Sequence, residues 1–183
     1  MICSLDAVAA TRERAGEHAG SARTERALAS AAVVPVALAV IHLTVAAAWA
    51  GSMAYSLVVV QPKVAAFFGA DARQEEFLTV LAQGNRWRVI GLIAVLLVSG
   101  IGVVVTTSTA AVVGFAVAVG LDAVAALAFA EVSWRHWPRR VFALPEEVPG
   151  YQRALRIRAR IMLVLVGIAF LIALGSAVGL GVR

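Results

Sequence analysis

Residues 32–60 read AVVPVALAVIHLTVAAAWAGSMAYSLVVV, and this stretch contains no Asp, Glu, Lys or Arg. Its only side chain that titrates near neutral pH is His42. A bilayer core about 30 Å thick needs about 20 helical residues to cross it, so the stretch is long enough to span a membrane. No charged residue occurs between Arg26 and Lys63. The solvent for this part of the chain is therefore expected to be lipid.

The composition of the whole chain agrees with a membrane protein. Of 183 residues, 61% are hydrophobic and 15% are charged, and the mean hydropathy is +0.88. Soluble domains usually carry about 25% charged residues. The net charge is +5, but the basic residues lie beside apolar runs. We therefore expect anionic lipid headgroups, and not nucleic acid, to be their partners.

Three more apolar segments follow the first. We predict spans at about 32–60, 89–105, 110–131 and 161–181, with a tight turn at the hydroxyl cluster 106–109. Helices are expected because backbone amides must be satisfied inside lipid, and the segments lack the alternation of a membrane β-barrel. The predicted fold class is all-α, an integral membrane four-helix bundle over residues 28–183 after a disordered polar tail at 1–27.

The basic residues predict the orientation of the chain. Of the 16 Lys and Arg, four lie in the N-terminal tail and one at the C-terminus, and the other eleven lie in the two longer loops or at their edges. The positive-inside rule then places both loops in the cytoplasm and both termini outside. The predicted location is the cell membrane, with several passes.

Two loop segments are expected to be helical. Asp71 and Gln74 have the spacing of a capping box, and Gly84-Asn85 supplies a stop, so a short surface helix is predicted at about 71–83. A basic helix is predicted at about 151–160, running into the fourth span. The basic cluster of this region is Arg139, Arg140, Arg153, Arg156 and Arg160. It is either a docking site for anionic lipid or a membrane protein partner, or an ordinary charged stop.

Three ionisable groups fall within predicted spans, where they are costly unless they are paired or reached by water. Glu131 lies at the inner end of the third span with Arg135 one turn later, so we predict an interfacial salt bridge. The nine residues from Asp122 to Glu131 correspond to a net turn of about 180°, so these carboxyl groups point to opposite faces. Asp122 must therefore find its partner on another helix, either as a neutral acid or as a carboxylate beside a cation.

His42 is the candidate partner for Asp122. It lies ten residues from Ala32, Asp122 lies twelve from Ala110, and the two spans run in the same direction, so their depths are similar. Two interpretations stay open. In the first, the ring only forms a hydrogen bond with a backbone carbonyl or with Thr44. In the second, it ligates a metal or haem, or relays a proton, and Asp122 orients it.

The pattern around His42 resembles the first helix of the copper resistance protein D membrane domain. The residues that carry the likeness are His42, Trp49, Gly51, Gln61 and Pro62, and the run SGIG at 99–102 is similar to the end of the second helix of that group. The likeness covers about the first half of the chain. It implies a four-helix membrane domain that handles copper, with His42 as a candidate ligand.

A weaker likeness is to the four-helix bacterial protoporphyrinogen oxidase, a haem protein whose first helix also carries histidine, tryptophan and glycine. It implies haem b with His42 as axial ligand. Thiolate and thioether ligands for copper(I) are few in this chain. Met53 lies about 16 Å along the helix from His42, so the two cannot bind the same ion. The other two are Met162 and Cys3, besides the initiator.

Small residues predict close helix packing, within one chain or between chains. The packing candidates are Gly51, Gly100, Gly102, Gly175 and Gly179. Three functions remain open at this point: a membrane protein that handles copper or serves as a partner subunit, a haem-binding redox enzyme, and a scaffold without a cofactor. The sequence indicates no catalytic residue, and a non-enzymatic role is favoured.

Overall fold

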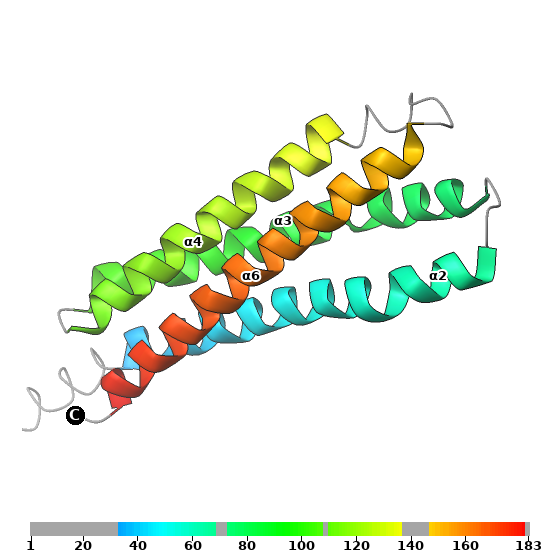
Figure 1. The fold of residues 1–183 in the computed structure, drawn as a ribbon. Helices are drawn as coiled ribbons and strands as arrows, with labels where there is room; N and C mark the ends of the chain where they lie inside the picture. The colour runs from blue at the N-terminus through cyan, green and yellow to red at the C-terminus, as the bar shows by residue number, and fades with distance from the viewer. Residues whose placement is uncertain (1–32, 69–72, 108–109, 137–146, 182–183) are drawn as a thin grey trace, which may run out of the picture.

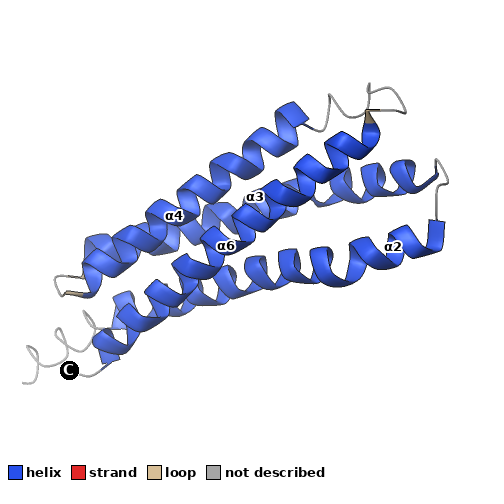
Figure 2. Cartoon of the chain, viewed as in Figure 1, coloured by secondary structure: helices blue, strands red, loops and turns tan. Residues whose placement is uncertain are grey.

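The computed structural model describes residues 33–68, 73–107, 110–136 and 147–181, and every regular element in these ranges is helical. Four long helices lie side by side as a bundle (Figure 1). Figure 2 shows the same view coloured by secondary structure. Each of the four is long and apolar enough to cross a membrane: Val33–Phe68, Gly84–Thr106, Ala111–Arg135 and Pro149–Val178.

The first helix continues beyond its predicted end at residue 60. After an α-helical part, 33–55, it passes through one π-helical turn, η1 (Ser56–Val60), into α2 (Gln61–Phe68). Pro62 explains the change, because its ring clashes with the carbonyl four residues earlier and it has no N–H. The Gln61 N–H bonds to the Ser56 carbonyl, which is the five-residue spacing of a π turn. The chain therefore accommodates the proline without ending the helix.

The predicted surface helix at 71–83 is not a separate element in the described residues. One helix, α3 (Arg73–Thr106), runs through Gly84 and Asn85 into the second span. A glycine in a helix costs about 1 kcal/mol relative to alanine. That cost is small beside the hydrogen bonds of a 34-residue helix. The glycine and asparagine therefore do not act as a stop, and residues 71–72 lie outside the described part.

The second half of the chain forms α4 (Ala111–Glu131), a π-helical turn η2 (Val132–His136) and α6 (Val148–Gly181). The predicted basic helix at 151–160 is the N-terminal part of α6. At the predicted turn, Thr106 donates its hydroxyl to the Gly102 carbonyl at 2.7 Å, and residues 108–109 lie outside the described part. The predicted disordered tail, 1–27, also lies outside it.

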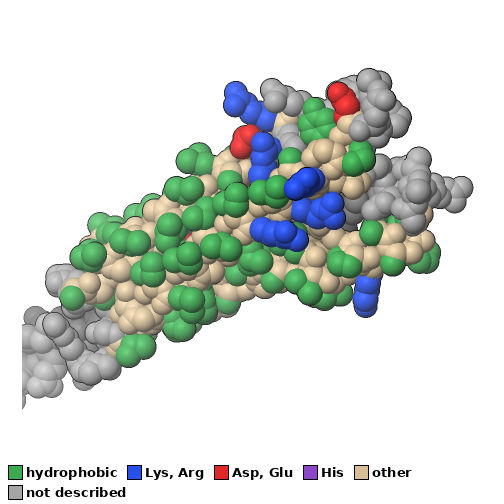
Figure 3. All heavy atoms as spheres, in the orientation of Figure 1, with side chains coloured by type: hydrophobic (Ala, Val, Ile, Leu, Met, Phe, Trp, Pro, Cys, Tyr) green, Lys and Arg blue, Asp and Glu red, His purple; other side chains and the backbone are tan. Residues whose placement is uncertain are grey.

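The interior contains two apolar clusters at different depths. The first lies at the end of the bundle where the first helix starts and α3 ends. It contains Ala39, Val103, Phe115, Ala118, Ala169 and Ala173. The second, further toward α2, contains Ala46, Trp49, Leu96, Ala125 and Val166. Large hydrophobic side chains are also widely exposed on the outside of the bundle (Figure 3). A protein in water rarely exposes so much apolar surface, whereas lipid solvates it.

The predicted packing glycines divide into two groups. A Cβ on Gly102 would lie 2.9 Å from Leu38 Cδ1, and Gly100 is similarly close to another helix. Gly51 and Gly175 are exposed and have no atom within 4 Å of such a Cβ, so they do not pack helices together within this chain. The reason is angular, since both glycines fall on outward faces of their helices. The surroundings of Gly179 lie outside the described side chains.

Candidate functional site

His42 points from the first helix into the bundle, and its side chain is 0% exposed. Its Nδ1 lies 3.0 Å from the Leu96 carbonyl oxygen on α3. A carbonyl can only accept a hydrogen bond, so Nδ1 carries a proton and donates it. In the neutral ring Nε2 then presents a lone pair. The contact with α3 therefore sets both the orientation and the tautomer of the imidazole.

Gly100 allows this approach. A Cβ at that position would lie 2.9 Å from His42 Cε1 and Nδ1 and 2.5 Å from Val119 Cγ2. Ser99 also donates its hydroxyl to the Leu96 carbonyl at 3.0 Å, and to the Val95 carbonyl at 2.7 Å. The missing side chain at Gly100 therefore opens a place on α3 where the ring reaches a backbone oxygen.

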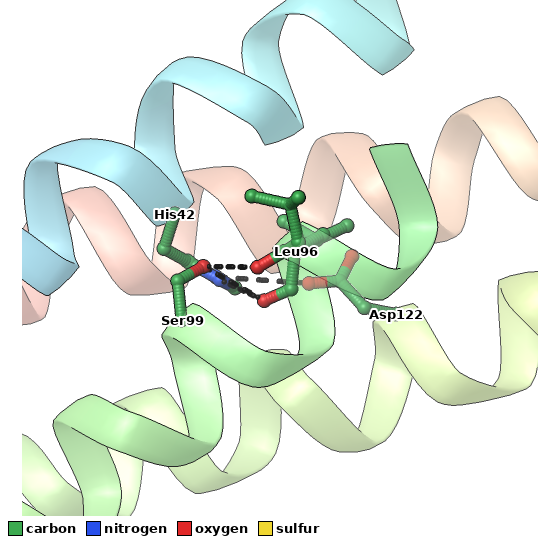
Figure 4. A network of polar contacts seen from close by, with 5 residues as sticks. His42, Leu96, Ser99 and Asp122 are labelled. Atoms are coloured by element: carbon green, nitrogen blue, oxygen red, sulfur yellow. Dashed lines mark hydrogen bonds and ion pairs between the residues drawn. The ribbon is translucent and has the colours of Figure 1, made fainter. Parts of the chain in front are cut away.

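Asp122 on α4 faces His42 across the interior (Figure 4). Its Oδ2 lies 3.7 Å from His42 Nε2, and both side chains are 0% exposed. Within the described part of the chain, His42 Nε2 and both Asp122 carboxyl oxygens are buried without a hydrogen-bond partner. The separation is suited to an ion pair and is too long for a direct hydrogen bond. The structure therefore brings the two groups into one interior space.

The pair lies between the two apolar clusters and is closed off on both sides. On one side the ring of Phe115 contacts the imidazole edge-to-face, with centroids 5.7 Å apart. On the other side Trp49, 2% exposed, lies two turns further along the first helix. Ala118 and Ala125 flank Asp122 on α4 and are fully buried. Charges interact strongly in such a poorly solvated place, and an unpaired charge there is costly.

The charge balance of the pair depends on how many protons it carries. A carboxylate beside a neutral imidazole would leave one uncompensated charge in the interior. One proton shared between Asp122 and His42 gives either an acid beside a neutral ring or an ion pair, and both arrangements have zero net charge. A single proton at this place therefore satisfies the pair, and it can reside on either partner.

A metal centre would have few protein ligands at this place. No group of three or more His, Cys, Asp and Glu side chains occurs in the described ranges that could hold a metal ion. His42 and Asp122 together supply two ligand side chains. A haem does not fit the arrangement, because Nε2, the ring nitrogen left for iron, faces the Asp122 carboxyl group at 3.7 Å. Phe115 and Gly100 hold the ring closely on other sides.

The predicted salt bridge between Glu131 and Arg135 is not formed. Glu131 instead pairs with Arg158 on α6, with Oε1 and Nη2 3.5 Å apart. The π turn η2 begins directly after Glu131, so a residue four positions later no longer lies above it as it would in an α-helix. Arg153, Arg156 and Arg160 are exposed on α6. Arg139 and Arg140 lie outside the described residues.

Several residues of this site were not among the sequence candidates. Thr44 donates its hydroxyl to the Val40 carbonyl. The carbonyl that holds His42 is that of Leu96, on another helix. Phe115, whose ring contacts His42, is one of many apolar residues in its span, and nothing in its sequence position distinguishes it. The available signal was the small residue Gly100 next to the polar Ser99 in an otherwise apolar span. That signal marks a close approach, but it does not say which helix approaches.

Comparison with known proteins adds no relative. No family model matches the chain, and no curated protein or solved structure is significantly similar. The resemblance to the copper resistance protein D group therefore depends on the residues around His42 and the 99–102 run.

Proposed function

We propose that this chain is a multi-pass protein of the cell membrane that binds one proton at His42 and Asp122 and acts as a proton relay within the bilayer. The observation that carries the proposal is the buried pair itself: Nε2 and Oδ2 lie 3.7 Å apart and have no other described partner. Ionisable side chains inside membrane helices commonly belong to proton or ion pathways.

The anchoring of His42 supports this role. A relay needs one ring nitrogen held so that the other keeps facing the proton donor. The Leu96 carbonyl holds Nδ1, and Nε2 faces Asp122. Because the pair is neutral when it carries one proton, it can stay loaded in a lipid-surrounded interior at little electrostatic cost.

The proposed setting follows from the charge distribution. The basic side chains gather toward the end of the bundle where α2 ends and α6 begins (Figure 3). By the positive-inside rule this end faces the cytoplasm, and both termini lie outside. Anionic lipids contact the exposed arginines of α6, and a membrane protein partner couples proton binding to a second process.

Proton flux in proteoliposomes tests the relay. Purified protein is reconstituted with a trapped pH-sensitive dye, and a potassium diffusion potential drives proton entry. We expect flux above that of empty vesicles for the unchanged protein and for Glu131→Gln, whose carboxyl group is partly exposed. Asp122→Asn and His42→Gln are expected to lower flux to the background, because each removes one proton site. Equal flux from Asp122→Asn and the unchanged protein would contradict the proposal.

Copper handling is the second candidate, favoured by three buried ligand atoms without partners, His42 Nε2 and the two Asp122 oxygens, and by the first-helix resemblance. Two side chains leave the remaining ligand positions to water or a partner. Metal analysis of the purified protein separates the candidates: stoichiometric copper lost in His42→Ala would support copper handling. A visible absorption spectrum tests haem in the same sample, and protein without flux, copper or haem would be a scaffold.

A further inference from the structure

We propose a second site, at the end of the bundle where α4 ends and α6 begins, that binds the phosphoethanolamine headgroup of a membrane phospholipid. This inference goes beyond the proton relay and does not depend on it. A pocket of about 300 Å³ opens there between the end of α4, η2 and the first turns of α6. The polar side chains that line it are Glu131, Arg135, Glu147, Tyr151 and Arg158.

The charges around this pocket balance and alternate. Two guanidinium groups and two carboxyl groups line it, and the 3.5 Å pair between Glu131 and Arg158 shows that the two signs are interleaved. Arginine suits phosphate oxygens because its planar fork donates two parallel hydrogen bonds. Carboxylates accept hydrogen bonds from an ammonium group. The lining therefore complements a ligand that carries a phosphate and an ammonium close together.

This complementarity separates the common headgroups. Phosphoethanolamine carries one phosphodiester charge and one ammonium with N–H donors. A phosphoglycerol headgroup has no cation to face Glu131 and Glu147. Phosphocholine has a cation without N–H donors, so it forms no hydrogen bond to either carboxylate. Phosphatidylethanolamine is therefore the lipid that matches both halves of the lining.

The position of the pocket identifies a lipid as the source of this headgroup. Leu127, one turn before Glu131, is 71% exposed, and Ile161, just after Arg158, is 53% exposed. Acyl chains of a lipid seated in the pocket would lie over these apolar side chains. Trp134, next to Arg135, is 51% exposed, and tryptophan is common at the membrane interface. Figure 3 shows acidic and basic side chains gathered at this same end.

The size of the pocket agrees with a headgroup. Its volume of about 300 Å³ lies at the lower end of the range of about 300–1,000 Å³ typical of small-molecule sites. It is therefore suited to a polar headgroup, with the acyl chains remaining outside in the bilayer.

Competitive lipid retention tests the site. The full chain, purified in mild detergent, is mixed with equimolar phosphatidylethanolamine, phosphatidylglycerol and phosphatidylcholine of one acyl composition, and bound lipid is counted by native mass spectrometry. We expect phosphatidylethanolamine to be retained about tenfold over the other two. Arg135→Gln should abolish this preference. Arg88→Gln, the same charge change on an exposed residue of α3 that does not line the pocket, should leave it unchanged.

Three results would overturn the proposal. Equal losses in Arg135→Gln and Arg88→Gln would mean that the basic surface binds lipid without a defined site. Retention of phosphatidylglycerol equal to or above that of phosphatidylethanolamine would exclude the zwitterionic ligand. Displacement of the lipid by an equal concentration of soluble O-phosphoethanolamine would identify a soluble compound, and not a lipid, as the ligand.

Discussion

At the scale of single residues, Gly100 is the position on which the geometry of the buried pair depends most. A Cβ there would stand 2.9 Å from two atoms of the His42 ring and 2.5 Å from Val119 Cγ2. A rigid buried ring cannot move away without losing its bond to the Leu96 carbonyl. We therefore expect Gly100→Ala to lower the free energy of unfolding by about 1–3 kcal/mol, as overpacked cores do. Thermal or denaturant unfolding in detergent, followed by circular dichroism, measures this change.

Gly91→Ala is the matched control for that prediction. Gly91 lies on the same helix, is exposed and has no atom within 4 Å of an added Cβ. Its substitution should leave the free energy of unfolding unchanged or raise it by up to about 1 kcal/mol, because alanine is favoured over glycine in a helix. Equal effects of the two substitutions would show that the His42 ring does not pack against α3 at Gly100.

At the scale of helices, Arg86 joins the start of the second span to the end of the third. Its Nη2 donates to the Ser133 carbonyl at 2.9 Å, and its guanidinium lies 5.7 Å from the centroid of the Trp134 ring. The last carbonyls of a helix lack intrahelical partners, and Ser133 lies in the closing turn η2. Arg86 thus donates a hydrogen bond to one of these carbonyls at the helix end.

Arg86→Gln is accordingly expected to lower the free energy of unfolding by about 1–2 kcal/mol, the range for a partly exposed hydrogen bond from a charged donor. Arg88→Gln removes the same charge from an exposed neighbour on α3 and should have little effect. The unfolding measurement used for the glycine variants compares them. A loss in both variants of similar size would assign the effect to net charge instead of the Ser133 contact.

At the scale of the whole molecule, the uneven distribution of basic residues predicts the orientation. Eleven of the 16 Lys and Arg belong to the loops and loop edges between the first and second spans and between the third and fourth. Translocating those segments would carry most of the positive charge across the membrane, which the positive-inside rule disfavours. We expect a fusion after Arg183 to place alkaline phosphatase in its active, external location and to leave green fluorescent protein dark.

A fusion within the loop at 137–146 is the internal comparison for this experiment. It should give the opposite pattern, a fluorescent reporter and inactive phosphatase, because that loop is predicted to face the cytoplasm. Fluorescence from the C-terminal fusion would show that the orientation is the opposite one, with both termini in the cytoplasm. The bundle itself would be unaffected by that outcome, since four spans put both termini on one side in either case.

The helical fold was predictable because it follows from local chemistry. Apolar runs of sufficient length must form helices in lipid, so the presence of four long apolar helices could be read from composition. The continuity of α3 through Gly84 and the passage of the first helix through Pro62 could not be read in this way. Both depend on whether the local cost of a glycine, about 1 kcal/mol, or of a proline, about 3 kcal/mol, outweighs the hydrogen bonds of a long helix.

What the sequence by itself determined is that four apolar segments can span a membrane and that His42 and Asp122 fall within the first and third of them; their similar depth was a prediction. Tertiary structure alone decided that they face each other at 3.7 Å, that Leu96 holds the ring and that Glu131 pairs with Arg158 and not with Arg135. The physical reason is that depth follows from the rise per residue along one helix. Which faces meet depends on how four helices rotate about their axes when small residues such as Gly100 let them approach.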